Sequence, residues 1–269
     1  MKIFKYLFLS LIIILCSCNR YLPGFDFDIF KETSSYELAL AVKNESIDEI
    51  TEIVVKKKIF IDAADPKFGH TLLMLAVANN LKASVKALLE LGADANKRSK
   101  MKSSTNEVVT PLFICCNHIY KKEYCNIEVL RLLIDHGGKV DDEIDIQYTH
   151  SNYRSIETPL MLATKNDCLS VIKFLVQSGA DINKYDYKDG HGPISNSIIL
   201  GNLNVLRYLI IDRKAKIPKY CFVRQAHNES LREELTITDL LNEQDYVENT
   251  NEFHIKEEVI SYLKKSNLK

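Results

Sequence analysis

Cysteine and histidine are the side chains of this sequence best suited to metal binding or nucleophilic chemistry. Four of them lie close together as Cys115, Cys116, His118 and Cys125, and His136 follows. A structural zinc site needs about four such ligands in a tetrahedral arrangement, and Cys-x-x-Cys pairs usually mark it. The sequence has no Cys-x-x-Cys pair. We therefore expect no metal and no cofactor, and we keep a Cys/His metal or redox site in this stretch as the alternative function.

These thiols could also serve other chemistry. Spacing permits a disulfide between Cys116 and Cys125, which would persist in an exported protein, but spacing alone does not fix the pairing. Cys115 and Cys168 fall at positions that favour small buried side chains. Cys116 and His118 stand two residues apart on a predicted helix, where side chains do not face each other. With no G-x-S-x-G, H-E-x-x-H or phosphate-binding glycine loop either, we predict that the protein is not an enzyme.

Composition places the chain among globular proteins of moderate charge. It has 269 residues, of which 46% are hydrophobic and 26% charged, and its formal net charge is −1. This length is enough to bury a sizeable core. A nearly neutral chain without a basic stripe argues against binding to nucleic acid.

The stretch over residues 157–183 shows how the chain is built. Thr158 and Pro159 form a helix start signal, and the apolar residues after them set a short buried face. After a break at Asn166, a second apolar run has i, i+3, i+4 spacing, which predicts a second helix. Gly179 supplies the left-handed residue that ends it. The stretch is therefore predicted to form one helix–turn–helix unit.

Versions of this unit recur along the chain, beginning near residues 36, 71, 110, 158 and 192. Their pattern is Thr-Pro-Leu, two helices and a closing Gly-Ala-Asp-x-Asn, which resembles the ankyrin-repeat family with its period of about 33 residues. The resemblance implies an all-α ankyrin-repeat solenoid of helix–turn–helix units joined by inter-repeat hairpin fingers. Such units stack because none of them can bury its apolar face alone.

The spacing of the units sets the expected organisation. Five ankyrin repeats are expected over residues 36–218, and a C-terminal capping repeat over residues 219–269. The third repeat carries an insertion between its helices, around residues 120–125, and the fingers before the third and fourth repeats are lengthened. The first repeat lacks both Thr-Pro-Leu and the closing glycine, as a capping repeat can.

Two departures from the family pattern bear on the helix ends. Met74, Phe113 and Met161 replace the histidine of the family's Thr-Pro-Leu-His, which puts the inter-repeat hydrogen bond of that histidine in doubt. Arg213 stands where the fifth repeat would end in glycine, so we expect a looser helix end there.

The first residues of the chain predict export. Two lysines precede an apolar run over residues 6–15, as in a secretory signal peptide covering residues 1–17, and this run is shorter than the roughly 20 residues that span a bilayer. The sequence Leu15-Cys16-Ser17-Cys18 resembles a bacterial lipobox, which implies that Cys18 becomes the lipidated first residue of the mature protein. An ordinary signal peptide and an uncleaved apolar tail are the alternatives. Residues 18–35 are then a lipidated, solvated tether whose aromatic side chains pack on the first repeat or lie at the membrane surface.

The lengthened fingers hold the candidate partner-binding residues. In ankyrin proteins, partners usually meet the finger tips and the exposed part of the first helices, and Tyr and Arg are enriched among binding hot spots. On this sequence the resemblance maps that face to Lys97, Arg98, Lys100, Lys102, Tyr148, His150, Tyr153, Arg154, Tyr185, Tyr187, Lys188 and His191. The other interpretation is that these residues form ordinary solvated loops.

We therefore predict a non-catalytic protein-binding ankyrin-repeat lipoprotein. It would be anchored through a lipid on Cys18 to a bacterial envelope membrane, facing the periplasm or the cell surface. One concrete version, by analogy with other repeat lipoproteins, is an immunity or inhibitor protein that shields a cell from a toxic enzyme. The expected partners are a protein and the membrane, not nucleic acid, and the sequence does not identify the protein.

Overall fold

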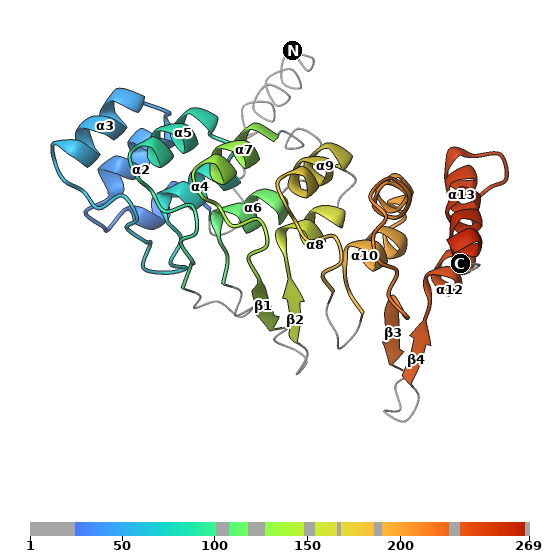
Figure 1. The fold of residues 1–269 in the computed structure, drawn as a ribbon. Coiled ribbons are helices and arrows are strands. Elements are labelled where there is room, and N and C mark those ends of the chain that lie inside the picture. Colours follow the sequence, from blue (N-terminus) through green and yellow to red (C-terminus); the bar gives the residue numbers. More distant parts are fainter. Residues whose placement is uncertain are drawn as a thin grey trace, which may run out of the picture.

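Helix pairs stand side by side in a row in the computed structural model of the chain (Figure 1). The structure describes residues 25–100, 108–117, 127–147, 154–165, 168–185, 190–225 and 232–266. The helices form two layers, and loops and two β-hairpins project from one side of the row (Figure 1). The prediction of an all-α solenoid of helix–turn–helix units is therefore confirmed.

The successive pairs are short helices joined by tight turns. They are α2 (Tyr36–Lys43) with α3 (Ile47–Val55), α4 (Leu72–Ala78) with α5 (Lys82–Glu90), α6 (Pro111–Asn117) with α7 (Ile127–Asp135), α8 (Pro159–Thr164) with α9 (Leu169–Gln177), and α10 (Pro193–Ile199) with α11 (Leu203–Arg207). A 3-10 helix, η1 (Phe27–Phe30), precedes them, and α12 (Ile237–Asn242) and α13 (Asn251–Ser266) follow. No helix in the described ranges combines the length and the apolar character needed to cross a membrane.

Threonines fix the starts of the first helices of several pairs. The Oγ1 atoms of Thr71 and Thr158 accept hydrogen bonds from the backbone N–H groups of Met74 and Met161, at 3.3 and 3.2 Å. Each bond satisfies one of the N–H groups that a helix leaves unpaired at its start. Met74 and Met161 themselves are buried. Buried apolar side chains thus occupy the two positions where the family pattern has histidine.

Residues in the left-handed region end the second helices of the pairs. Gly92, Gly137 and Gly179 have φ angles of +94°, +84° and +101°. In the fifth pair, α11 continues into a π-helical turn, η4 (Tyr208–Asp212), and Arg213 keeps a φ of −103°. The next residue, Lys214, takes the left-handed conformation instead, with a φ of +54°. The wider turn therefore moves the closing position one residue beyond the missing glycine.

Apolar side chains form one continuous core along the whole row, from Phe27 to Leu263. Phe27 and Phe30 are fully buried, and the backbone carbonyl of Phe25 accepts a hydrogen bond from Asn79 Nδ2 at 3.0 Å. Burying a phenylalanine side chain stabilises a fold by about 1.5–3 kcal/mol. The predicted tether is therefore part of the core from residue 25 onward, with its aromatic side chains packed against the first helix pairs.

Two of the projecting loops are antiparallel β-hairpins (Figure 1). In the first, β1 (Ile144–Gln147) pairs with β2 (Arg154–Glu157), so that Ile144 lies opposite Glu157. In the second, β3 (Phe222–Gln225) pairs with β4 (Arg232–Leu235). The first hairpin is the lengthened finger predicted before the fourth repeat. The second was not predicted, because its four-residue strands are too short and polar to give a clear strand pattern.

The unusual end of the fifth pair gives a testable prediction. Lys214→Gly should raise the free energy of unfolding by about 1 kcal/mol, because a left-handed backbone costs a residue with a side chain about 1–2 kcal/mol and costs glycine little. Arg213→Gly is the matched control and should lower it by about 0.5–1 kcal/mol, since glycine loses more backbone entropy in a right-handed position. Urea unfolding followed by circular dichroism measures both. Stabilisation by Arg213→Gly would contradict the assignment of the closing position.

Candidate protein-binding surface

The residues predicted for partner binding and for lipid attachment fall into three groups in the structure. Lys97, Arg98, Lys100, Tyr185 and His191 are described with their side chains. Arg154 begins β2, and only its backbone is described. The remaining predicted positions lie outside the described residues: Cys18, Lys102, Tyr148, His150, Tyr153, Tyr187 and Lys188.

Three of the predicted residues line one groove, which we name the finger groove. Its walls are the loop over residues 60–69, between α3 and α4, and Lys97, Arg98 and Lys100 in the loop after α5. Its volume is about 600 Å³. The groove thus joins the fingers of two successive helix pairs, and seven of its ten lining residues come from a loop that contributed no predicted site residue.

The wall formed by residues 60–69 is held by Asp65. This carboxylate is buried and accepts hydrogen bonds from the backbone N–H groups of Lys67, Phe68 and His70, at 2.8, 2.7 and 2.6 Å. Hydrogen bonds to an ionised group are among the stronger ones in proteins. The loop is therefore tied around its own carboxylate.

The two walls touch at Gly69. This residue has a φ of +71°, and a Cβ built on it would lie 2.5 Å from the backbone nitrogen of Lys100. No side chain fits at that distance, so only glycine allows the two loops to approach so closely. Next to it, the ring of His70 stacks on the ring of Phe25, with centroids 4.6 Å apart.

The charges of the finger groove are unequally compensated. The Asp62 carboxylate accepts a hydrogen bond from the Asp94 N–H at 3.1 Å, and burial raises the pKa of Asp62 above its ordinary value. Arg98 Nη2 lies 2.6 Å from Asp142 Oδ1 and also donates to the carbonyl of Glu143 at 3.2 Å. Lys97 and Lys100 make no ion pair within 4 Å with any residue that the structure describes, but the charge of Lys97 acts on Asp62 and opposes the effect of burial on the pKa of that carboxyl.

Side chains in the fingers bind the backbone of the neighbouring finger. Asn96 Nδ2 donates to the carbonyl of Gly137, and Asn96 Oδ1 accepts from the N–H of Lys139, both at 2.8 Å. Asn183 Oδ1 accepts from the N–H of Lys216 at 2.6 Å. Asn96 and Asn183 are the last residues of the two Gly-Ala-Asp-x-Asn sequences. That sequence pattern could have identified both residues as contacts between fingers. We name these contacts the finger ladder, and it holds successive loops at a fixed spacing.

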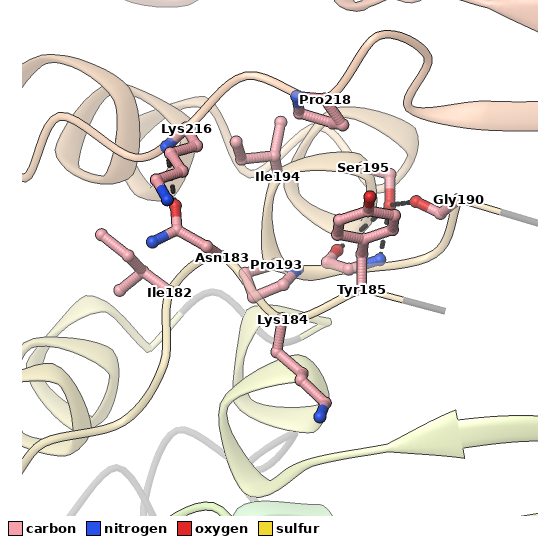
Figure 2. Close-up of a pocket in the computed structure, with 11 residues that line it drawn as sticks. Ile182, Asn183, Lys184, Tyr185, Gly190, Pro193, Ile194, Ser195, Lys216 and Pro218 are labelled. Atoms are coloured by element: carbon pink, nitrogen blue, oxygen red, sulfur yellow. Dashed lines mark hydrogen bonds between the residues drawn. The ribbon is translucent and has the colours of Figure 1, made fainter. Parts of the chain in front are cut away.

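A second, smaller pocket lies in the fifth pair. Figure 2 shows Ile182, Pro193, Ile194 and Pro218 around it, with Tyr185 near Ser195. Its volume is about 20 Å³, which is room for about one water molecule. Lys184 at its edge forms an ion pair with Glu143. Tyr185 therefore lies beside a pocket too small for a ligand.

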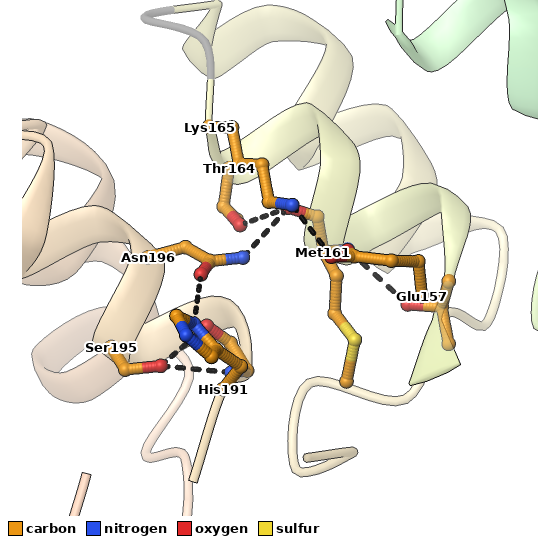
Figure 3. Close-up of polar contacts among 9 residues, drawn as sticks. Glu157, Met161, Thr164, Lys165, His191, Ser195 and Asn196 are labelled. Atoms are coloured by element: carbon orange, nitrogen blue, oxygen red, sulfur yellow. Dashed lines mark hydrogen bonds and ion pairs between the residues drawn. The ribbon is translucent and has the colours of Figure 1, made fainter. Parts of the chain in front are cut away.

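His191 takes part in the packing between the fourth and fifth pairs. It is half-buried, its Nδ1 lies 3.3 Å from Asn196 Oδ1, and its ring meets Phe222 edge-on at 5.4 Å. Asn196 Nδ2 donates in turn to the carbonyl of Met161 at 3.0 Å (Figure 3). These contacts give His191 a structural role, and they provide a hydrogen bond between repeats that does not need the family's histidine.

Glu157 is a buried carboxylate in the same region. Its Oε1 pairs with Lys165 Nζ at 2.6 Å (Figure 3). Its Oε2 is buried without a hydrogen-bond partner among the described residues. Glu157 is buried and Lys165 is partly exposed, so removing Lys165 would leave a buried carboxylate without its ion pair and destabilise the fold.

The two cysteines of α6 are free thiols with raised pKa values. Cys115 and Cys116 are free, and burial raises the pKa of Cys115 to about 12 and that of Cys116 well above its ordinary value. The disulfide that the spacing permits between Cys116 and Cys125 does not form, because Cys116 is a free thiol buried in the core. Cys168 is instead disulfide-bonded, and its partner lies outside the described residues. Its interpretation as a free apolar side chain is wrong.

The alternative of a metal site remains a prediction. His136 lies at the end of α7, where its Nδ1 is 2.8 Å from the carbonyl of Leu132. No three His, Cys, Asp or Glu side chains in the described part of the chain are grouped so that they could hold a metal ion. His118 and Cys125, which complete the predicted cluster, lie outside that part.

The chain matches known proteins over most of these pairs. The family model of ankyrin repeats in three copies matches residues 38–144, 99–186 and 144–220. The ankyrin repeat and KH domain-containing protein mask-1 of Caenorhabditis elegans is 25% identical over 195 residues, 68% of this chain and 7% of that protein. The human ankyrin repeat and SOCS box protein 2 is 31% identical over 109 residues, 40% of this chain and 14% of that protein. The chain thus spans only a small part of these relatives.

Among solved structures, the chain resembles the ankyrin repeat domain of Bcl-3, described as a unique member of the IkappaB protein family. The TM-score is 0.53 with 20% sequence identity, and the likeness covers 69% of this chain and 74% of that chain. At this identity the likeness establishes the fold.

The finger ladder can be tested by stability measurements. Asn96→Ala removes two hydrogen bonds between fingers and Asn183→Ala removes one, and each such bond contributes about 0.5–1.5 kcal/mol. We expect Asn96→Ala to lower the free energy of unfolding by about 2 kcal/mol and Asn183→Ala by about 1 kcal/mol. Chemical unfolding of the three proteins gives the values. Equal, small effects of the two substitutions would show that the ladder does not hold the fingers.

Proposed function

The chain belongs to the ankyrin-repeat family, and from this premise we propose that it is a non-catalytic protein-binding lipoprotein that uses its fingers to hold a partner. The finger groove carries this proposal. A concave site of about 600 Å³, with apolar and charged residues on its walls, has the size and composition of binding sites in proteins. Three residues predicted from the sequence line it together.

The state of two thiols argues against nucleophilic cysteine chemistry. The thiolate is the nucleophilic form of cysteine. Burial raises the pKa of Cys115 and of Cys221 to about 12, so both are protonated at neutral pH. A protonated thiol is a poor nucleophile, so neither cysteine favours catalysis.

The proposed location is a bacterial envelope membrane, with the protein facing the periplasm or the cell surface. The signal peptide over residues 1–17 and the lipobox at Cys18 support it, although both lie outside the described residues. The disulfide at Cys168 gives independent support, because disulfides persist in oxidising compartments outside the cytosol.

An immunity or inhibitor protein is the concrete version that we propose. Such a protein needs a firm binding surface at the envelope and no catalytic groups of its own. The rigid fingers and the protonated thiols are consistent with that requirement. The analogy to other repeat lipoproteins remains the basis of this version.

The proposed location predicts a defined covalent state. Cys16 would leave with the signal peptide and Cys18 would carry the lipid, so that Cys125 is the thiol left for Cys168. Forming that bond removes one hydrogen atom from each thiol and passes two electrons to an acceptor such as the disulfide of an oxidoreductase.

We expect the membrane-fraction protein to have the mass of residues 18–269 plus acyl chains, and a Cys18→Ala variant to lack this species. Non-reducing proteolytic mapping should yield a peptide that joins Cys125 to Cys168. Intact mass spectrometry and peptide mapping measure the two features. An unmodified full-length chain in the cytosol, with Cys168 reduced, would overturn the proposed location.

Protein binding is tested separately by co-purification. The full-length protein, solubilised from crosslinked and from native envelopes, should retain a stoichiometric protein partner. A double charge reversal on the finger side, Lys97→Glu with Lys100→Glu, should reduce recovery of that partner. Recovery of no partner from either preparation would count against the proposed function.

A further inference from the structure

We propose that the finger groove binds an acidic segment of a partner protein and seats an apolar side chain of that segment against Phe60. This inference rests on the proposed protein-binding function and specifies its chemistry. It follows from the shape of the groove, its apolar surface and its three basic side chains.

The groove has the dimensions of a peptide-binding site. Its volume of about 600 Å³ falls in the range of about 300–1,000 Å³ that is usual for binding pockets. The pocket beside Tyr185 measures about 20 Å³ and holds no more than about one water molecule. Of these two concave sites, only the finger groove accommodates several side chains.

Phe60 provides an exposed apolar contact in this groove. Its side chain is 65% exposed, whereas Phe27 and Phe30 in η1 are fully buried. Ala63 and Pro66 lie on the same wall. Exposed aromatic side chains inside a concave site are typical anchors of protein interfaces, because they bury a large area at low cost in conformational entropy.

The charges favour an acidic occupant. The carboxylates of the groove already accept hydrogen bonds from backbone N–H groups, three at Asp65 and one at Asp62. On the other wall, Lys100 has no ion pair with a described residue, Lys97 interacts electrostatically with Asp62, and Arg98 shares its charge with Asp142. A basic segment would meet these lysines with unfavourable electrostatic energy, whereas carboxylates would compensate them.

The groove is also formed in advance of binding. The contact between Gly69 and the Lys100 backbone joins the two walls, and Asp65 ties one of them internally. Arg98 connects the other wall to the next finger through Asp142 and the carbonyl of Glu143. A site that does not need to be ordered on binding loses less entropy, so a short segment suffices to bind it.

A protein segment fits these observations better than a nucleic acid does. Nucleic-acid sites depend on a basic patch or stripe, and the whole chain has a formal net charge of −1. The apolar contact at Phe60 lies on a different wall from the lysines, which suits a chain with alternating acidic and apolar side chains.

The experiment selects ligands without assuming a partner. Full-length protein in detergent is used to select a phage-displayed library of random dodecapeptides, and the enriched peptides are synthesised with a fluorophore. We expect them to be acidic with at least one apolar residue, to bind more weakly as salt is added, and to compete with each other. Fluorescence polarisation gives their affinities.

Three variants test whether the selected peptides bind in the finger groove. Lys97→Glu with Lys100→Glu should weaken the selected peptides by at least about tenfold, and Phe60→Ala by about five- to tenfold, as for interface hot spots. Lys264→Glu with Lys265→Glu, the same change in charge on α13, should leave their affinity unchanged. Circular dichroism of each variant confirms that it is folded.

Each other outcome overturns the inference. Neutral or basic selected peptides, equal binding to the Lys97/Lys100 variant, no enrichment, or equal competition by a single-stranded oligonucleotide would do so. If a partner still co-purifies from the envelope and is lost only on changes elsewhere, the inference fails and the proposed function stands. If neither peptides nor an envelope partner bind, both fail.

Discussion

Each helix pair depends on its neighbours to bury its apolar face, and the rest of the structure follows from that dependence. The helices α2 to α9 have six to nine residues, whereas isolated helices shorter than about 12–15 residues are marginal in water. Stacking of the pairs supplies the stability that such short helices lack, and the core is continuous from Phe27 to Leu263. The two ends of the row need separate covers. At one end η1 contributes two buried phenylalanines, and at the other α13 packs Val259 and Leu263 inward.

Apolar burial has no direction, so a second interaction must set the position of one finger against the next. Hydrogen bonds from finger side chains to the neighbouring backbone do this, at Asn96, Asn183 and Asp62. Asp141 adds one more by accepting from the Asp181 N–H at 2.9 Å. These bonds join residues about one repeat apart. The loops are therefore held by their neighbours, and a groove between two loops keeps its shape without a ligand.

The molecule consists of a packed body of helices and a projecting edge of fingers, and these two parts hold different kinds of side chain. The free thiols and the Glu157–Lys165 pair lie in the body, where burial keeps the thiols protonated and the ion pair closed. The exposed aromatic and the three basic side chains lie at the edge, in the finger groove. Among the described residues, Cys116 and Cys221 are therefore enclosed, whereas Phe60 and Lys100 are exposed at the groove. This distribution is what a binding protein requires.

The sequence by itself determined the repeat unit and its turns, because caps such as Thr158 and left-handed residues such as Gly179 act on a few neighbouring residues. It also placed Lys97, Arg98 and Lys100 together on one finger. Only the tertiary structure decided that Phe60 lines the same groove, that Cys116 is a buried free thiol, and that Cys168 is disulfide-bonded. It also decided that the closing residue of the fifth pair is Lys214. These features depend on contacts between segments about one repeat apart, or on how a helix end meets its neighbour. Stacking brings those segments together, and local preference along the chain contains no information about which side chains will then meet.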